Sequence, residues 1–285
     1  MNPAAGRGRT RRLLPRLRAA LREIDIDVEV SAGPDEPKQI AHAACSDGRG
    51  IVACGGDGLV AELAGVAAER DAPLAVVPTG AGNDFARALG LQPRRPLDAI
   101  PVVRTGRERH IDLGRSGDRW FTSVANTGFD AEANRWANSV QLVSGTTLYL
   151  TAIARTLLTY RPHRFRLTVD DHEPEELRAW LVAFANTPSY AGGMRIAPDA
   201  VIDDGRLDVT IIGPVGTGTF VWNLPRVATG TITRHPDVSV RSGRRFVIEA
   251  LGDDHDELWA SGERVGPLPA DVSVAPRALR AVVPT

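Results

Sequence analysis

The first hundred residues alternate between short apolar runs and longer stretches with helical spacing. The runs at 26–30 (IDVEV), 50–54 (GIVAC) and 73–78 (PLAVVP) predict buried strands, because they are short and rich in β-branched residues. The stretches PKQIAHAAC, LVAELAGVAAER and NDFARALGL carry apolar residues at helical spacing and predict helices. This alternation is typical of a doubly wound α/β domain with a mostly parallel sheet.

The pattern changes after about residue 104. Short alternating stretches bounded by turn residues predict an antiparallel sheet or sandwich, and they read HIDLG, RWFTSVAN, RFRLTVDD, LRAWLVAFAN, GRLDVTII, RRFVIEA and ADVSVAP. One helix is predicted among them, at 147–160. We therefore expect an α/β domain over 1–104 and a β-rich sandwich over 105–277, with residues 278–285 able to return to the first domain. A cleft between the two is the natural active site.

Composition narrows the class of protein. A chain of 285 residues is long enough for two domains that each bury a core. The 34 basic and 35 acidic residues leave a formal charge of -1, which argues against a nucleic-acid partner. Two cysteines without zinc-ligand spacing favour a reducing cytoplasm. We find no signal-peptide pattern and no apolar run of about 18 residues, so we expect a soluble cytoplasmic protein that is still able to touch a membrane.

Two glycine-rich turns, GGDG (55–58) and PTGAGND (78–84), follow predicted strands and precede predicted helices. Bare backbone N–H groups and the positive end of a helix dipole attract phosphate there, and the glycines allow positive φ and close approach of a ligand. Both turns follow the carboxyl ends of strands, so they should face one site. Asp57 would repel phosphate unless magnesium or its water lies between them. Taken singly, each is equally an ordinary turn, with Asn83 or Asp84 capping a helix.

Further acidic or glycine turns follow: NTGFDAE (126–132), YAGGMRIAPDAVIDDGRLDV (190–209) and WASGERVGPLP (259–269). Each alone is better explained as a hairpin turn. Together with GGDG and GNDFAR, in this order over essentially the whole chain, they resemble the diacylglycerol kinase catalytic family, which includes bacterial lipid kinases and sphingosine and ceramide kinases. A related fold and GGDG turn occur in NAD kinase, but the GNDFAR block and the DDG turn favour the lipid kinases.

The resemblance implies an NAD kinase- or phosphofructokinase-like first domain, a lipid-binding second domain, and transfer of the γ-phosphate of ATP to a lipid hydroxyl, with Mg²⁺. Diacylglycerol, giving phosphatidic acid, is the expected acceptor. The implied nucleotide contacts are Asn2, Gly6, Ser31, Gly55, Gly56, Asp57, Gly58, Thr79, Gly80 and Asn83. The implied magnesium and water network is Asp57, Asp84 and Asp130, and a second, structural metal site would use the Asp204 side chain and the carbonyls of Val201 and Arg206. Glu263 matches the catalytic base, so the catalytic set is Glu263, Asp57 and Asp130.

A lipid substrate implies peripheral contact with the inner face of the membrane. The apolar stretch LYLTAIARTLL lies beside Arg155, Arg161 and Arg164 and could rest on anionic lipid. The alternative is a helix packed on the β-rich domain. The sequence leaves open whether the protein forms a homodimer.

The chain departs from the family pattern at three polar positions. Leu59 and Ala81 stand where the family has threonines, with Thr79 close enough to substitute in part, and Ser261 replaces the aspartate of DGE. A weakly active lipid-binding or regulatory homologue therefore stays an alternative. The apolar strand that leads into the NP turn is also absent before Asn2, so we expect an unpaired sheet edge.

Overall fold

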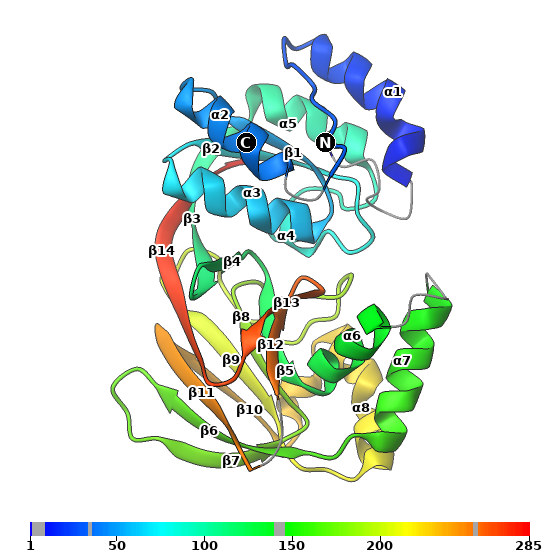
Figure 1. Ribbon diagram of the computed structural model, residues 1–285, viewed down its shortest axis with the longest axis vertical. Coiled ribbons are helices and arrows are strands. Elements are labelled where there is room, and N and C mark those ends of the chain that lie inside the picture. Colours follow the sequence, from blue (N-terminus) through cyan, green and yellow to red (C-terminus); the bar gives the residue numbers. More distant parts are fainter. Residues whose placement is uncertain (2–8, 34–35, 140–145, 253–255) are drawn as a thin grey trace.

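The computed structural model describes residues 1, 9–33, 36–139, 146–252 and 256–285. Two halves lie along the long axis of the molecule (Figure 1). The first half contains α1 (Arg9–Arg22), α2 (Glu36–Ser46), β1 (Ile51–Gly55), α3 (Asp57–Glu69), β2 (Pro73–Pro78), α4 (Asp84–Ala88), η2 (Pro96–Asp98) and α5 (Ala99–Thr105). Its core joins the apolar faces of these helices to β1 and β2.

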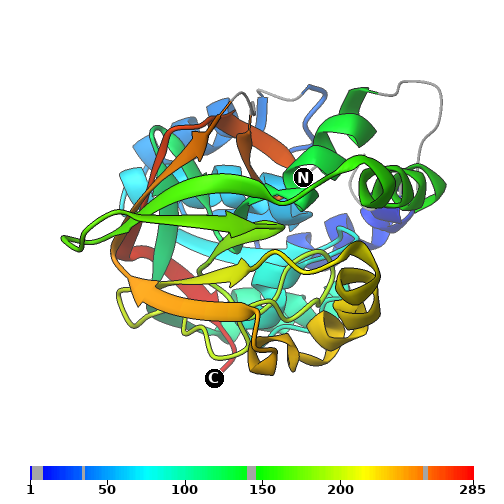
Figure 2. The ribbon, with the colours of Figure 1, turned by 90° about the horizontal axis from the view of Figure 1, so that it is seen from below.

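The second half is a two-sheet structure with helices on one side (Figure 2). Its elements are β3 (Arg107–Ser116), β4 (Arg119–Phe121), β5 (Val124–Gly128), α6 (Phe129–Ser139), α7 (Thr146–Thr159), β6 (His163–Val169), β7 (Glu175–Ala179), β8 (Leu181–Ala185), β9 (Leu207–Ile212), α8 (Thr217–Thr229), η3 (Ile232–Arg234), β10 (Val238–Gly243), β11 (Arg245–Leu251), β12 (Glu257–Ala260), β13 (Glu263–Pro267) and β14 (Ala270–Val283). An α/β half followed by a β sandwich confirms the predicted fold class.

The two halves share one sheet. Its order is β1-β2-β14-β11-β6-β7, with β3 and β4 attached to β14. The pairs β1–β2 and β2–β14 are parallel, and β14 runs antiparallel to β3 and β11. The long β14 therefore ties the end of the chain to the first half, since Arg280 and Ala281 pair with Pro73 and Leu74. The second sheet, β10-β9-β8-β5-β12-β13, is antiparallel throughout.

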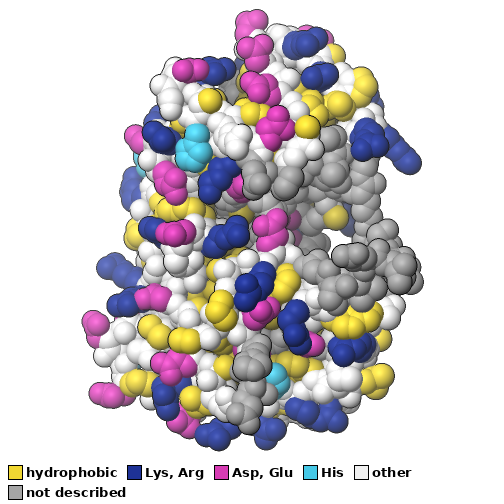
Figure 3. All heavy atoms as spheres, in the orientation of Figure 1, with side chains coloured by type: hydrophobic (Ala, Val, Ile, Leu, Met, Phe, Trp, Pro, Cys, Tyr) yellow, Lys and Arg dark blue, Asp and Glu magenta, His cyan; other side chains and the backbone are white. Residues whose placement is uncertain are grey.

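Two apolar clusters fill the second half. Phe165, Phe184 and Phe246 are completely buried between the two sheets. On the other face of the second sheet, the Trp180 ring stacks on Phe220 of α8 with centroids 4.5 Å apart. Buried aromatic rings contribute large apolar areas, so these contacts fix the helices against the sheet. On the face drawn in Figure 3, basic and acidic side chains are interspersed, in keeping with the near-zero net charge.

Most predicted elements are confirmed, and the exceptions have physical causes. Residues 26–30 form no strand. Ile26, Val28 and Val30 are half-buried and the two residues between them are exposed, which is the period of a strand, but no described strand pairs with this segment. The stretch LRAWLVAFAN is two strands, because β7 and β8 belong to different sheets and the chain crosses between them at Trp180.

Helices of the second half were under-predicted. The helix expected at 147–160 is α7, but α6 and α8 also occur. The α8 sequence TGTFVWNLPRVAT hides its periodicity, because it has an interior Pro225, a glycine and several threonines. Within the described residues, no helix is both long enough and apolar enough to span a bilayer.

Candidate active site

The two glycine turns lie back to back. The Thr79 and Gly80 N–H groups both donate to the Gly55 carbonyl, at 2.9 and 3.2 Å. A Cβ built on Gly80 would stand 2.4 Å from the Cα of Gly56, so only glycine permits this approach. None of the GGDG glycines has a positive φ, so that expected reason for glycine is wrong. Close contact is the reason instead, because a Cβ on Gly55 would also meet the Leu59 side chain at 2.5 Å.

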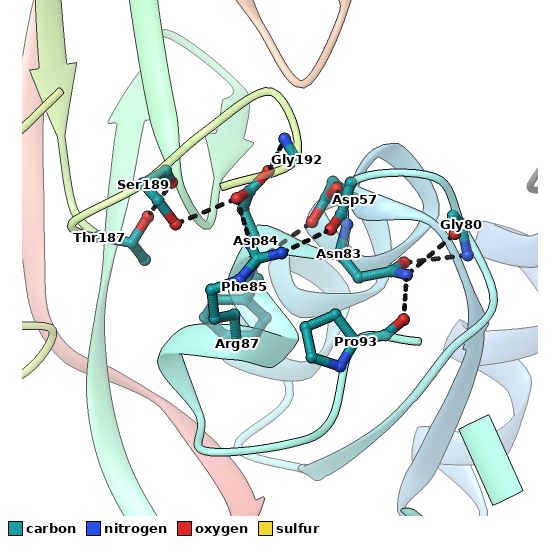
Figure 4. Close-up of polar contacts among 11 residues, drawn as sticks. Asp57, Gly80, Asn83, Asp84, Phe85, Arg87, Pro93, Thr187, Ser189 and Gly192 are labelled. Carbon is teal, nitrogen blue, oxygen red and sulfur yellow. Dashed lines mark hydrogen bonds and ion pairs between the residues drawn. The ribbon is translucent and has the colours of Figure 1, made fainter. Parts of the chain in front are cut away.

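Asp57 is the first residue of α3 and holds the second glycine turn in place (Figure 4). Its carboxylate accepts hydrogen bonds from the backbone N–H groups of Asn83, at 2.7 Å, and Phe85, at 3.3 Å. The Asn83 side chain does not cap α4. It instead bonds the Gly80 N–H and carbonyl at 2.9 Å each and the Pro93 carbonyl at 2.9 Å. The carboxylate that accepts from the N–H groups at the start of α4 thus belongs to Asp57 of α3. This link fixes the two turns relative to each other.

Asp84 links the two halves of the molecule. Its side chain is buried and accepts hydrogen bonds from the Ser189 hydroxyl at 3.0 Å and the Gly192 N–H at 2.7 Å, both in the second half. Arg87 donates to the same carboxylate. Burial raises the pKa of Asp57, and the negative charge of Asp84 raises it further. Two carboxylates are therefore held together at the junction of the halves.

The three predicted aspartates line one cavity. Its volume is about 350 Å³, and Asp57, Asp84 and Asp130 share its wall with Ala81, Tyr190 and Ser261. Asp130 lies in α6, and the Tyr190 hydroxyl donates to its carboxylate. Burial raises the pKa of Asp130. Residues from both halves thus enclose a polar space of the size of a ligand site.

Glu263 lies next to the GGDG turn but in a neighbouring cavity. A Cβ on Gly58 would stand 3.2 Å from the Glu263 carboxylate oxygen. This second cavity, of about 210 Å³, lies between α3 and the β12–β13 turn, and Ser261 lines both cavities. The Glu263 side chain is exposed. The predicted base therefore faces the N-terminal turn of α3 and remains open to water.

The remaining predicted nucleotide contacts are only partly described. Thr79 is completely buried, and it is not among the residues that line the aspartate cavity. The Ser31 hydroxyl donates to the Met1 carbonyl at 3.2 Å. Asn2 and Gly6 lie outside the described residues.

The predicted structural metal site forms a tight turn. Asp204 is exposed and accepts a hydrogen bond from the Arg206 N–H at 3.0 Å, and Val201 is exposed on the surface. The turn is anchored by Asp112, which sequence reasoning missed. This fully buried carboxylate accepts hydrogen bonds from the N–H groups of Gly205, at 2.6 Å, and Arg277, at 2.7 Å. Burial raises the pKa of Asp112. The sequence did contain a signal for Asp112, because an acid within the otherwise apolar stretch HIDLG indicates a buried carboxylate that needs hydrogen-bond partners.

The acidic pair near the glycine turns fits a magnesium ion that keeps water ligands. Among the residues that the structure describes, no three His, Cys, Asp or Glu side chains gather closely enough to hold a metal by themselves. Asp57 and Asp84 nevertheless converge, because a Cβ on Gly82 would stand 2.8 Å from one carboxylate and 3.1 Å from the other. Magnesium commonly binds through one or two carboxylates together with phosphate oxygens and water.

Comparisons with known proteins agree along the whole chain. Residues 1–116 match the family model of the diacylglycerol kinase catalytic domain, and residues 123–283 match that of the YegS C-terminal NAD kinase beta sandwich-like domain. A diacylglycerol kinase of Mycobacterium tuberculosis is 33% identical over 99% of this chain and 93% of its own length. A probable lipid kinase YegS-like protein of Xanthomonas oryzae is 34% identical over 73% of this chain and 71% of its own.

Solved structures share the fold. A diacylglycerol kinase structure from Bacillus anthracis superposes with a TM-score of 0.74, covering 99% of this chain and 94% of that one at 17% identity. A second B. anthracis structure gives a TM-score of 0.81, covering 99% and 93% at 20% identity. The arrangement of an α/β half on a β sandwich is therefore common to these proteins.

Proposed function

We propose, from the premise that this chain belongs to the diacylglycerol kinase catalytic domain family, that it transfers the γ-phosphate of ATP to the hydroxyl of diacylglycerol and releases phosphatidic acid. The observation that carries the proposal is the pair of half-buried Asp57 and buried Asp84, held where two glycine turns meet and open to a cavity that both halves enclose. This arrangement suits a polyphosphate with its magnesium on one side and an acceptor on the other.

The phosphates would bind at the start of α3. The first N–H groups of a helix have no partner within the helix, and the helix dipole is positive at that end. Asp57 and Asp84 would hold magnesium, which when bound neutralises phosphate charge and helps to align the transferred group. Because both carboxylates are already fixed by backbone N–H groups and Ser189, little rearrangement is needed when the nucleotide arrives.

The acceptor hydroxyl needs a base. An alcohol has a pKa far above 7, so its proton must leave as the oxygen bonds to the γ-phosphorus and the bond to the ADP oxygen breaks. Glu263 is the base in this proposal, because its carboxylate lies beside Gly58, at the turn that would hold the phosphates. The Asp84 contacts with Ser189 and Gly192 would keep the acceptor half in register with the nucleotide half.

A phosphorylation assay tests the reaction. The protein is incubated with Mg-ATP and, separately, with diacylglycerol, sphingosine, ceramide, NAD or no acceptor, and products are identified by mass spectrometry. We expect phosphatidic acid and ATP consumption that depends on diacylglycerol. NADP as product would instead assign an NAD kinase, and a phosphorylated sphingoid lipid would change the acceptor. Lipid binding without ATP consumption would indicate a regulatory homologue.

Peripheral membrane contact is part of the same proposal, and it is supported by α7 and α8. Both views place these helices on one side of the molecule (Figures 1 and 2). Among the described residues, Trp222 of α8 and Leu158 of α7 are the most exposed large apolar side chains, at 83% and 79%. The exposed Arg161 follows α7, the exposed Arg226 lies in the last turn of α8, and no acid occurs in 209–236. An exposed tryptophan beside arginines suits the interface of an anionic bilayer.

Co-sedimentation with liposomes tests the membrane contact. Binding should increase with the anionic lipid fraction and decrease with salt. Trp222→Ser should weaken it, whereas Val240→Ser, at an exposed position on β10, should not. Equal loss in both variants would contradict a specific role for α8.

A further inference from the structure

Two polar groups in the wall of the aspartate cavity are buried without a hydrogen-bond partner. They are the Ser123 hydroxyl and the Asn126 side-chain oxygen Oδ1, and both residues line the cavity. Each residue is only 5% exposed. Buried polar groups are nearly always hydrogen-bonded, because an unmade bond costs free energy. Two such exceptions in a cavity wall therefore mark the place of a ligand group, and the reaction as described so far gives neither residue a role.

The two groups are held on a rigid part of the second half. Asn126 lies in β5, and Ser123 directly precedes this strand, which leads into α6 (Figure 1). β5 is an interior strand, because it pairs with β8 on one side and with β12 on the other. The Ser123 carbonyl also accepts a hydrogen bond from the Asn186 N–H at 2.8 Å. The backbone that carries both groups is therefore fixed before a ligand arrives.

The cavity combines acidic groups with these neutral ones. Asp57 and Asp84 line it from the first half and Asp130 lines it from α6, and none of the described lining residues is basic. Ser123 and Asn126 are the two buried side chains among the described lining residues that are polar and uncharged. An ionised carboxylate only accepts hydrogen bonds, whereas a hydroxyl or an amide can also donate. A ligand group that accepts hydrogen bonds, such as a carbonyl, is therefore best bound at Ser123 and Asn126.

We propose that Ser123 and Asn126 determine acceptor specificity, by binding the carbonyl of an ester or amide linkage next to the hydroxyl that is phosphorylated. This inference rests on the proposed lipid kinase function and deepens it. The serine hydroxyl donates to the carbonyl oxygen, and the asparagine amide, which both donates and accepts, pairs with the same linkage. Ser261 lines both this cavity and the one that contains Glu263, so an acceptor bound in this way can extend its hydroxyl toward the predicted base.

The same arrangement discriminates against lipids without the carbonyl. An ether oxygen is a poor substitute for a carbonyl, and a free ammonium group only donates. Either would leave the Ser123 hydroxyl without an acceptor. A site that is built to hydrogen-bond a substrate group rejects analogues that lack the group, because its own buried polar atoms then stay unpaired.

Acceptor analogues test the proposal from the side of the substrate. The unmodified protein is assayed with Mg-ATP and dihexanoylglycerol, with the diether dihexylglycerol, or with a short-chain ceramide. We expect kcat/KM to be at least about 10-fold lower for the diether than for the diester, since each hydrogen bond contributes about 3- to 10-fold. The ratio of diester to ceramide shows whether the linkage is an ester or an amide. Equal kcat/KM for the diester and the diether, with ceramide no better than either, would overturn the proposal.

Protein variants test it from the other side. Ser123→Ala and Asn126→Leu should each lower kcat/KM for the diester about 3- to 10-fold, mainly through KM, and should hardly change it for the diether. Thr127→Val is the matched control, because the Thr127 hydroxyl is also buried and unpartnered in β5, but Thr127 is not among the described residues that line the cavity. It should leave both lipids unaffected. Equal losses for diester and diether in Ser123→Ala and Asn126→Leu would indicate a structural role and overturn the assignment.

Calorimetric titration with the same lipids, without ATP, separates this proposal from the reaction. A preference for the carbonyl lipid that disappears in Ser123→Ala and Asn126→Leu would support the site even if no lipid were phosphorylated. Turnover of diacylglycerol without any such preference would overturn the site and leave the proposed function intact. Thermal denaturation adds a readout that a structural role would move in the opposite direction. Both variants should melt at or above the temperature of the unmodified protein, because an unpartnered buried group costs stability, and a clear fall in both would contradict the proposal.

Discussion

The two sides of the candidate active site are built differently. On the side proposed to bind the nucleotide, Asp57 is half-buried and Asp84 is buried, and backbone N–H groups and a serine hydroxyl fix their oxygens. On the opposite side, Glu263 is exposed at the end of a hairpin turn. One side holds charge in a rigid, preorganised frame, and the other presents a carboxylate to water.

The difference indicates how each side contributes. Acids whose oxygens are fixed by hydrogen bonds keep their positions before a ligand arrives and suit the binding of a metal and phosphates. An exposed carboxylate keeps access to solvent and can release a proton after each turnover. We therefore expect substitutions on the nucleotide side to change binding or stability, and substitutions at the turn to change the rate of the chemical step.

Removing the predicted base should have the largest effect. Glu263→Gln should lower kcat for lipid phosphorylation by about 10²- to 10⁴-fold, because a positioned base contributes about that much. The affinity for Mg-ATP should change little, since in the proposed mechanism the phosphates bind to the other half. Steady-state kinetics together with calorimetric titration of nucleotide separates the two quantities.

Glu69→Gln is the matched control, because Glu69 lines the same cavity from α3. Its kcat should stay within about twofold of the unmodified protein, as for most surface substitutions. Full activity in Glu263→Gln would reject the assignment of the base. Equal losses in both variants would show that the cavity needs negative charge rather than a base at one position.

Asp57→Asn should give the next largest effect, and this effect should be on the binding of Mg-ATP. The amide keeps the size of the side chain but removes the charge that would hold magnesium, and it replaces one of the two oxygens that accept from the Asn83 and Phe85 N–H groups with a donor. We expect Mg-ATP affinity to fall about 10- to 100-fold, the range seen when groups that support a metal site are lost. Asp118→Asn, on an exposed turn, is the control. Unchanged affinity in Asp57→Asn would move the metal site elsewhere.

These contrasts also explain what the sequence could predict. The strands at 51–55 and 73–78 and the turns after them were readable because a parallel sheet core makes continuous apolar runs with glycine at their ends. Ligands of parallel sheets bind at the carboxyl ends of the strands, and this rule predicts that Asp57 and Asp84 face the same cavity. It does not predict that Asp130 joins them. Asp130 was placed by the resemblance.

Other features depend on contacts that no local pattern records. Residues 26–30 have the period of a strand, but pairing needs a neighbour, and Met1 is the described residue that pairs with them. The roles of Ser189, Gly192 and Asp112 come from partners about a hundred residues away in sequence. Helix α8 was missed because it depends on burial of Phe220 against Trp180 more than on its own propensity.

Gly80→Ala should have a moderate effect, and this effect should be on the stability of the folded protein. The new Cβ would stand 2.4 Å from the Cα of Gly56, so the two glycine turns must separate. We expect a loss of about 1–3 kcal/mol in the free energy of unfolding, the usual cost of forcing atoms into a packed site. Chemical denaturation measures it. Gly33→Ala meets no atom within 4 Å and should be nearly neutral. An unchanged free energy of unfolding in Gly80→Ala would mean that the two glycine turns can move apart. The side of the site that carries Asp57 and Asp84 would then not be more rigid than the side that carries Glu263.

The smallest effect is expected at Ser261, in the turn that carries the predicted base. Ser261 and Gly262 are the two residues between the paired Ala260 and Glu263, and both have positive φ, 54° and 80°. A two-residue hairpin of this kind favours Asn-Gly or Asp-Gly, because asparagine and aspartate tolerate the left-handed region better than serine. Ser261→Asn and Ser261→Asp should therefore both stabilise the protein, by about 0.5 kcal/mol, which is the scale of a surface substitution.

The two Ser261 variants also separate the conformation of the turn from its charge. Ser261→Asp puts a second carboxylate two residues from Glu263, and a nearby like charge raises the pKa of a base. A base with a pKa closer to the working pH accepts a proton more effectively, so kcat should stay equal or rise in Ser261→Asp and stay unchanged in Ser261→Asn. Equal gains in both variants would assign the benefit to the turn alone. A fall in kcat for Ser261→Asp alone would mean that the carboxylate repels the phosphates, and the turn would then lie closer to the nucleotide than the separate cavities indicate.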